Sequence, residues 1–203
     1  MKKIFLLCLS VLMTTGLVKT NAQTSVSGGM KVEVNMSNFL LSDLNNQSSR
    51  MKVGPTLGGF LKVDLHENFA IQPELLFYYR QSKTKVGIEK DDFQQWGMQI
   101  PVYAVAQTRL GSGKGYFGVG PYLGIGFDAR MDKADINMYK KYDGKKWMNR
   151  CDFGLGVMIG YEFDNRVQLN AGYQIGFVDQ LDVLKDVASK RTQTVTLGLG
   201  YRF

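Results

Sequence analysis

A two-residue alternation of bulky with small or polar side chains dominates the C-terminal part of the chain. In residues 153–163 every odd position is bulky and apolar or aromatic, and glycines occupy most of the positions between them. The same pattern continues in 166–177 and 191–203. Because successive side chains of a strand point to opposite faces, this alternation predicts β-strands whose two faces meet different surroundings.

A similar but noisier alternation covers the preceding residues. The predicted strands lie near 26–36, 50–65, 69–82, 93–109, 115–128, 151–163, 166–177 and 191–203. Short connections at 66–68, 110–114 and 164–165 alternate with long ones at 37–49, 83–92, 129–150 and 178–190. Outer-membrane barrels have short periplasmic turns and long external loops. We therefore predict an all-β fold, an eight-stranded antiparallel up-and-down transmembrane β-barrel with a periplasmic N-terminus.

The first 22 residues have the layout of a secretory signal peptide. Lys2 and Lys3 precede an apolar stretch over 4–13, and small and polar residues follow as far as Ala22, after which we predict cleavage. That apolar stretch is too short to span a bilayer, and no later segment is continuously apolar over the length of a membrane helix. Residues 23–203 then form one outer-membrane β-barrel domain.

Cleavage at this position changes the charge and the cysteine content. The formal net charge falls from +7 to +4 with the loss of Lys2, Lys3 and Lys19, which removes the main support for nucleic-acid binding. One cysteine remains, Cys151, so no internal disulfide can form. With one histidine and one mature cysteine, the chain offers no metal-ligand cluster, and we expect no cofactor.

Alternation alone leaves open which face is outside, since a soluble lipocalin-like barrel would hold the bulky set inside. A charge at mid-bilayer on a lipid face costs about 2–4 kcal/mol, whereas a lumen can hold charges that pair. The polar set holds most of the glycines, which suit a narrow interior, and the apolar set places aromatic residues near the strand ends. The lumen ion-pair candidates are Lys31, Lys52, Lys62, Arg80, Arg109 and Arg202 with Glu33, Asp64, Glu74, Asp128, Asp152 and Glu162.

Four segments carry a family resemblance. They are KVEVNMSNF at 31–39, GPTLGGFLKVDL at 54–65, GVGPYLGIGF at 118–127, and VTLGLGYRF, which ends in Phe203. Over roughly 24–203 the chain resembles the small outer-membrane β-barrel family of Bacteroidetes, labelled PorT-like or outer membrane protein beta-barrel domain. The terminal aromatic resembles the signal recognised by the barrel-assembly machinery, an expected partner during biogenesis. The family label includes a gliding and type IX secretion component, but barrel resemblance does not transfer that role.

An eight-stranded barrel has room for side chains and little else, so we expect a filled lumen and a structural or adhesive role through the external loops. The first alternative is a narrow channel for small solutes, and the second is an accessory component of a secretion or gliding machinery. A lipid A-modifying enzyme comes last, because such an enzyme usually needs a histidine base near the external side, and the one histidine, His66, lies in a predicted periplasmic turn.

The predicted loop 129–150 is unusually basic, with aromatic residues between its charges. Most such loops are simply solvated. The sharper hypothesis is contact with lipopolysaccharide phosphates or another anionic surface through Lys140, Lys141, Lys145, Lys146 and Trp147. Outer-membrane lipid is the other expected partner. In the loop after the seventh predicted strand, apolar residues at helical spacing within 179–190 fit either a short helix or an irregular segment.

Overall fold

The computed structural model describes residues 24–41, 49–86, 89–131, 136–137, 139, 141–142, 145–146, 149–178 and 190–203. The predicted signal peptide and its cleavage site at Ala22 lie outside this part, as do residues 179–189. The long strands are β1 (Ser25–Leu41), β2 (Ser49–His66), β3 (Phe69–Val86), β4 (Glu89–Leu110), β5 (Gly113–Met131), β9 (Cys151–Glu162), β10 (Val167–Gly176) and β11 (Lys190–Arg202). Three two-residue strands are β6 (Ile136–Asn137), β7 (Lys141–Tyr142) and β8 (Lys145–Lys146).

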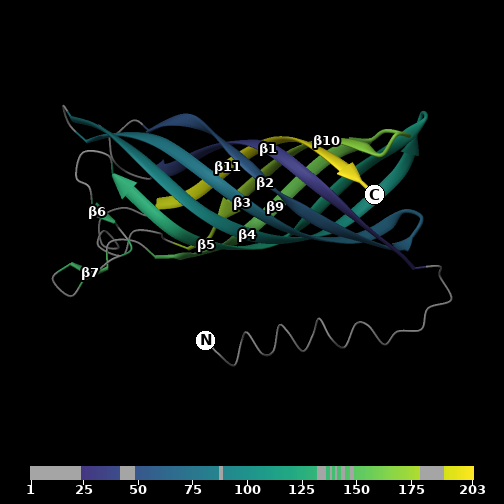
Figure 1. The fold of residues 1–203 in the computed structure, drawn as a ribbon, viewed down its shortest axis with the longest axis horizontal. Helices are drawn as coiled ribbons and strands as arrows, with labels where there is room; N and C mark the ends of the chain where they lie inside the picture. The colour runs from purple at the N-terminus through teal and green to yellow at the C-terminus, as the bar shows by residue number, and fades with distance from the viewer. Residues whose placement is uncertain are drawn as a thin grey trace, which may run out of the picture.

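The eight long strands form a closed antiparallel barrel (Figure 1). Each pairs with its neighbour in the chain, in the order β4-β3-β2-β1-β11-β10-β9-β5, and the β4–β5 pairing closes the sheet. β1 and β11, from opposite ends of the chain, pair along most of their length, from Gly29 opposite Arg202 to Leu41 opposite Lys190. No helix among the described residues is long and apolar enough to cross a membrane. The fold is the predicted up-and-down barrel.

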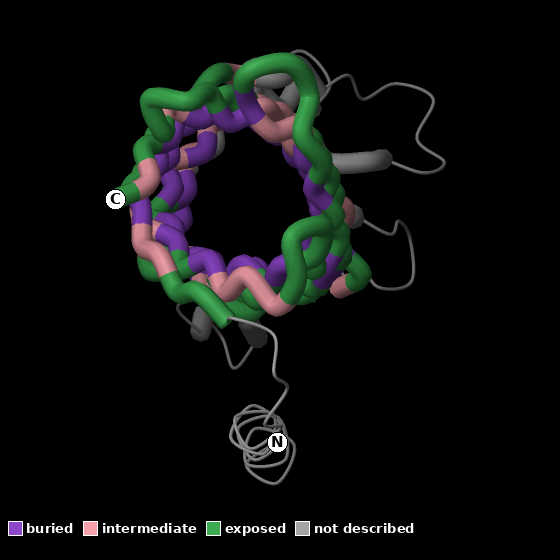
Figure 2. Tube along the Cα trace, turned by 90° about the vertical axis from the view of Figure 1, so that its right-hand side faces the viewer, coloured by how far each residue is buried: buried purple, intermediate pink, exposed green. Residues whose placement is uncertain are grey.

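The wall has a buried inner face and an exposed outer face (Figure 2). In β9 the even positions from Asp152 to Met158 point inward and are buried, whereas Phe153, Leu155 and Val157 are exposed. An apolar outer face with a polar inner face is the arrangement of a transmembrane barrel, because lipid excludes charges from the outer face. The apolar set therefore faces the membrane, and the soluble lipocalin-like alternative does not describe this fold.

The predicted external loop at 83–92 is wrong. β3 and β4 instead continue as a paired ladder up to Val86 opposite Glu89. The segment is rich in charged and polar residues, which suggested a loop, but antiparallel pairing outside the bilayer does not require an apolar face. The wall is uneven: β1 to β5 have 17, 18, 18, 22 and 19 residues, against 12, 10 and 13 in β9, β10 and β11. About 10 residues suffice to cross a bilayer in a tilted strand, so β1 to β5 are longer than the membrane requires.

A bulge in β5 interrupts the alternation near its external end. Gly126 pairs with Gly97 and Asp128 with Trp96, which leaves Phe127 without a partner in β4. After the extra residue the inward positions change parity, so Ala129 is fully buried. Asp128 and Arg130, two residues apart, instead form an ion pair of 2.7 Å between partly exposed side chains. The prediction that Asp128 lies in the lumen is therefore wrong, because a bulge moves the residues that follow it to the other face.

Candidate functional site

The middle of the lumen holds a fully buried charge cluster. Lys31 Nζ of β1 donates to both carboxylate oxygens of Glu74 of β3, at 2.7 and 2.9 Å. Glu33 lies 3.4 Å from the same ammonium, and Gln72 Nε2 donates to Glu74 Oε1 at 2.8 Å. All four side chains are at most 5% exposed. The alternation places them inside, and the closed barrel brings a cation of one strand to an anion two strands away.

A second cluster lies nearer the periplasmic end. Glu162 of β9 accepts from Arg202 of β11 and, at 2.8 Å, from Gln168 Nε2 of β10. Its carboxylate also lies 3.9 Å from Lys62 Nζ of β2. β2 and β9 are four places apart in the closed order of eight strands, so they stand on opposite sides of the barrel. The Lys62–Glu162 pair therefore spans the lumen.

The external third of the lumen holds a third polar group. Arg80 Nη2 donates to Gln99 Oε1 at 2.9 Å, and the Arg80 guanidinium lies 4.0 Å from the centre of the Tyr78 ring. Tyr122 donates its hydroxyl proton to Asp152 Oδ2 at 3.1 Å. A cation over an aromatic ring and a phenol on a carboxylate both stabilise charges that have left water.

Tyr139 brings part of the long loop into the external mouth. Its ring is 4% exposed and its hydroxyl accepts a hydrogen bond of 2.8 Å from Gln95 Nε2. The Arg150 guanidinium lies 5.5 Å from the ring centre, and the ring fills the space where Gly126 lacks a side chain. Burial raises the pKa of Tyr139 to about 12. The external end of the lumen is thus narrowed by a residue that no predicted strand contained.

Between the charged groups lies an apolar layer inside the lumen. It consists of Ala70, Tyr103, Val105, Tyr116 and Met158. The Tyr116 ring lies against the backbone of Gly160 on the neighbouring strand, so closely that a Cβ there would overlap it. Tyr103 accepts a hydrogen bond of 3.3 Å from Gln174 Nε2 of β10, three strands away. The interior glycines therefore make room for rings that reach across the barrel.

The remaining predicted lumen residues lie toward the ends. Lys52 is half-buried in β2. Asp64 is half-buried and accepts a hydrogen bond of 2.9 Å from Gln107 Nε2. Arg109 is exposed at the periplasmic rim, so its assignment to the lumen interior is wrong: the strand has reached the end of the barrel at this position. Gln72, Gln107, Gln168 and Gln174 are buried lumen residues that the search for charges missed, although the same alternation places them inside.

Two polar cavities open at the periplasmic mouth. One, of about 740 Å³, extends from Asp64 to Lys114, and the other, of about 330 Å³, lies between the β4–β5 and β9–β10 turns. Arg109 and Lys114 line both. Gln107, which is 4% exposed, lines the larger cavity, and its Oε1 has no hydrogen-bond partner in the described part of the chain. Sequence reasoning did not single out this mouth.

The described residues contain no group of three or more histidine, cysteine, aspartate or glutamate side chains that could hold a metal ion. His66 lies in the β2–β3 turn, where its Nδ1 accepts from the Asn68 amide at 3.3 Å. That bond stabilises a turn and gives His66 a structural role. Cys151 is exposed at the external end of β9.

The basic loop is described only in part. Backbone pairing of β7 with β8 sets Lys141 opposite Lys146 and Tyr142 opposite Lys145. Lys140 and Trp147 lie outside the described residues. The backbone pairing therefore brings lysine positions of the basic loop opposite each other.

Comparison with known proteins agrees with the fold. NspA, a Neisserial surface protein, has a TM-score of 0.51 at 16% identity, over 88% of this chain and 99% of its own. OprG of Pseudomonas aeruginosa gives 0.49 at 14%, over 88% and 94%, and Ail of Yersinia pestis gives 0.46 at 15%, over 89% and 99%. At these identities the likeness concerns the fold alone. No curated protein matches the chain in sequence.

The family match extends over most of the barrel. The family described as outer membrane protein beta-barrel domain matches residues 21–182. That range begins just before β1 and reaches beyond β10, so it contains seven of the eight long strands. Together with the apolar outer face, it places the protein in the outer membrane of a Gram-negative bacterium. The chain belongs to the outer membrane protein beta-barrel domain family.

Proposed function

We propose that this protein is a closed barrel that anchors its external segments in the outer membrane and acts through them, in a structural or adhesive role. The observation that supports a closed lumen best is the Lys62–Glu162 pair, which joins opposite walls. The Tyr103–Gln174 hydrogen bond crosses the lumen at another level, and Tyr139 occupies part of the external mouth. Side chains that meet across an eight-stranded barrel leave little room for a conducting path.

Single-channel recording in planar bilayers tests the closed lumen. The full mature barrel should give no stable conductance steps in potassium chloride. The double variant Lys62→Ser, Glu162→Ser, which removes the pair that joins the walls, should give small steps if the lumen is otherwise permeable. Steady conductance of the wild-type protein would overturn the closed barrel and favour the narrow channel.

For the external role, we propose contact with lipopolysaccharide phosphates through the basic hairpin. The backbone pairing of Lys141 with Lys146 supports it, because two lysine positions directly opposite each other in a strand pair favour an anion nearby. Lys140, Lys145 and Trp147 belong to the same proposed surface. Phosphate is a suitable partner because it carries several strong acceptor oxygens and negative charge.

Binding of the barrel to immobilised lipopolysaccharide tests this surface. Replacing Lys140, Lys141, Lys145 and Lys146 with serine should weaken binding about ten-fold or more, with a steep salt dependence in the wild type only. A matched control replaces Lys52, Lys83, Lys85 and Lys90 with serine, which removes equal charge from the external side of β2, β3 and β4. Unchanged binding in the first variant, or equal loss in both, would contradict the proposal.

Two other roles remain as weaker proposals. A component of a secretion or gliding machinery would be detected by crosslinking followed by co-purification of a defined complex. A lipid A-modifying enzyme would need an activated nucleophile at the external side. His66 lies at the opposite end of the barrel, and its Nδ1 is engaged with the turn backbone, so His66 does not serve as a base at the external side.

A further inference from the structure

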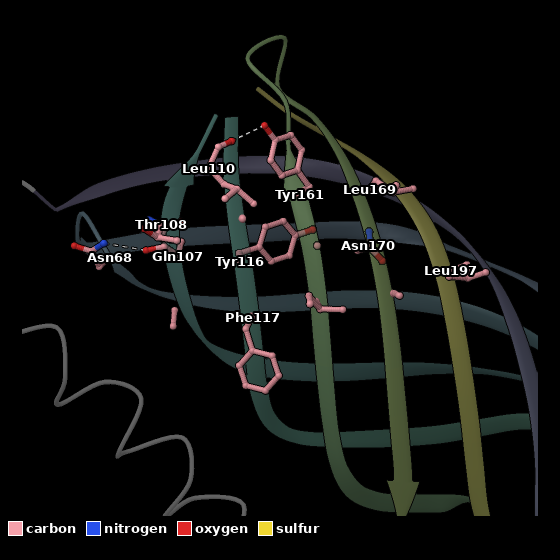
Figure 3. A pocket seen from close by; sticks show the side chains of 15 residues that line it. Asn68, Gln107, Thr108, Leu110, Tyr116, Phe117, Tyr161, Leu169, Asn170 and Leu197 are labelled. Carbon is pink, nitrogen blue, oxygen red and sulfur yellow. Dashed lines mark hydrogen bonds between the residues drawn. The ribbon is translucent and has the colours of Figure 1, made fainter. Parts of the chain in front are cut away.

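The outer face carries an apolar groove on its periplasmic half, between β4 and β11 (Figure 3). The cavity has a volume of about 760 Å³. Its floor contains the small residues Ala106, Gly115 and Ala171, and bulkier side chains such as Phe117 and Leu169 border it. Acyl chains suit a groove of this kind, because the exposed side chains around it are apolar or aromatic apart from Thr108 and the turn residue Asn68, whose Nδ2 donates to the Gln107 carbonyl at 3.1 Å.

The groove ends at the periplasmic turns. Tyr161 borders it, and the Tyr161 hydroxyl donates to the Leu110 carbonyl at 2.7 Å and accepts from the Gly113 amide at 2.9 Å. These two bonds tie β9 to the β4–β5 turn. The 330 Å³ cavity begins at the next residues along both strands, Gly111 and Glu162. The apolar groove and the polar cavity therefore adjoin across this turn.

Four cations border the polar cavity: Arg109, Lys114, Arg166 and Arg202. Arg202 is paired with Glu162, whereas the other three make no side-chain ion pair or hydrogen bond within the described residues, unlike the buried lysines of the lumen. Of the two carboxylates in the same cavity, Glu162 is engaged by Arg202 and Gln168, which leaves Asp164 as the opposing charge. The cavity thus has an excess of positive charge beside an apolar groove.

Arg166 has a further peculiarity. It is the one residue other than glycine with positive φ, 65°, among the described residues. Glycine would adopt this conformation without strain, and an arginine there costs conformational energy. The turn holds this conformation, because the Arg166 amide donates to the Phe163 carbonyl at 2.9 Å and the Arg166 carbonyl accepts from the Arg202 amide at 3.0 Å. The Arg166 side chain lines the polar cavity.

We propose that the groove and the three cations form one binding site for an anionic glycerophospholipid of the periplasmic leaflet. The acyl chains lie in the groove beside Phe117 and Leu169, and the phosphate lies against Lys114, Arg109 and Arg166. Membrane depth supports this occupant, because the cations lie at the periplasmic turns, where a phospholipid headgroup would be, and the groove runs from them toward mid-membrane.

Native mass spectrometry of the full mature barrel in detergent, titrated with phosphatidylglycerol, tests the headgroup end. A basic residue near an anionic lipid surface contributes about 1 kcal/mol, or roughly five-fold in affinity. Arg166→Gly should therefore lower the affinity about five-fold, and Arg109→Ser, Lys114→Ser and Arg166→Gly together about a hundred-fold. Arg166→Gly also relieves the strained φ, so its thermal stability should be equal or higher. Lower affinity at undiminished stability cannot come from misfolding.

The groove end has its own variant and control. Ala171→Trp fills the groove from the lipid side and should lower phosphatidylglycerol affinity by a similar factor. Val53→Trp adds the same side chain to another exposed outer-face position, on β2, and should leave affinity unchanged. The heat-dependent gel mobility of each variant reports whether the barrel is folded.

Two outcomes would overturn the proposal. If Ala171→Trp and the triple variant both bind phosphatidylglycerol as the wild type does, there is no site. If glycerol 3-phosphate competes at equal concentration and Ala171→Trp has no effect, the cavity is a site for soluble anions and the groove plays no part. The expected result is that glycerol 3-phosphate competes poorly, because it has no chain to fill the groove.

Discussion

The mid-lumen and periplasmic charge clusters have similar chemistry but different exposure. Lys31, Glu33 and Glu74 are each at most 5% exposed, and the Lys31–Glu74 pair has two hydrogen bonds below 3 Å. In the other cluster the Arg202 side chain is 21% exposed and Lys62 stands 3.9 Å from Glu162. Every side chain of the first cluster is buried, whereas the second meets solvent at the mouth through Arg202, although Lys62 and Glu162 are buried there too.

The difference shows that depth in the lumen decides what an ion pair contributes. A buried pair gains little over apolar side chains of equal size, because both charges lose their hydration, but loss of one partner leaves an uncompensated buried charge. Near the mouth, water can hydrate a charge that has lost its partner. The outward Asp128–Arg130 pair, with one side chain 63% exposed, is the solvated extreme of the same series. The clusters should therefore respond differently to equivalent substitutions.

The largest effect is expected for Glu74→Gln. It removes the carboxylate closest to Lys31, and Glu33 alone remains, at 3.4 Å. The free energy of unfolding should fall by about 3–5 kcal/mol, the cost of breaking a buried pair. Urea unfolding in lipid vesicles, followed by gel mobility, measures it. The exposed Glu67→Gln is the control, and a loss below about 1 kcal/mol for Glu74→Gln would remove the distinction between the clusters.

A second variant sharpens the same point. Lys31→Met, Glu33→Gln and Glu74→Leu together remove all three charges of the cluster, because Lys31 is also the partner of Glu33 at 3.4 Å. This triple variant should recover most of the stability lost in Glu74→Gln, to within about 1 kcal/mol of wild type. The same unfolding assay applies, and a triple variant as unstable as Glu74→Gln would contradict the idea that an unpaired buried charge causes the loss.

Arg202→Gln is expected to have an intermediate effect. Glu162 keeps Gln168 at 2.8 Å and Lys62 at 3.9 Å, and water reaches the mouth. The loss should be about 1.5–3 kcal/mol, typical of a hydrogen bond to a charged group. The comparison fails if Arg202→Gln destabilises the barrel more than Glu74→Gln does under the same conditions.

The smallest effect is expected for Asp128→Asn on the outer face. Exposed ion pairs contribute about 0–1 kcal/mol, so unfolding should change by less than that, and Arg130→Gln should match it. A loss above about 2 kcal/mol would show that the bulge needs the carboxylate for its geometry.

The side of the wall on which most residues lie could be predicted from the sequence. Phe153, Leu155 and Val157 face outward and Lys31 and Glu74 inward, because strand alternation is strictly periodic and lipid tolerates no unpaired charge. Asp128 was assigned to the wrong face because a single unpaired residue, Phe127, resets that period without a distinctive sequence pattern.

Contacts across the lumen could not be predicted in the same way. That Lys62 meets Glu162, and not another carboxylate of the lumen, depends on which strands face each other and on their stagger after closure. Tyr139 lies in a loop, where no periodicity places a side chain. The groove could not be predicted from the sequence, because it arises from three small residues on different strands.

The pairing of β1 with β11 also affects the rate at which the barrel folds. The first strand of the barrel has no partner on one side until the last strand is available, since Val34 pairs with Leu197 near the other end of the chain. Contacts between residues so far apart in the sequence form slowly, and a strand edge without a partner can aggregate before the contact forms. An assembly factor that covers the unpaired edge of β1 until β11 can pair with it would thus reduce the time during which the folding chain can aggregate.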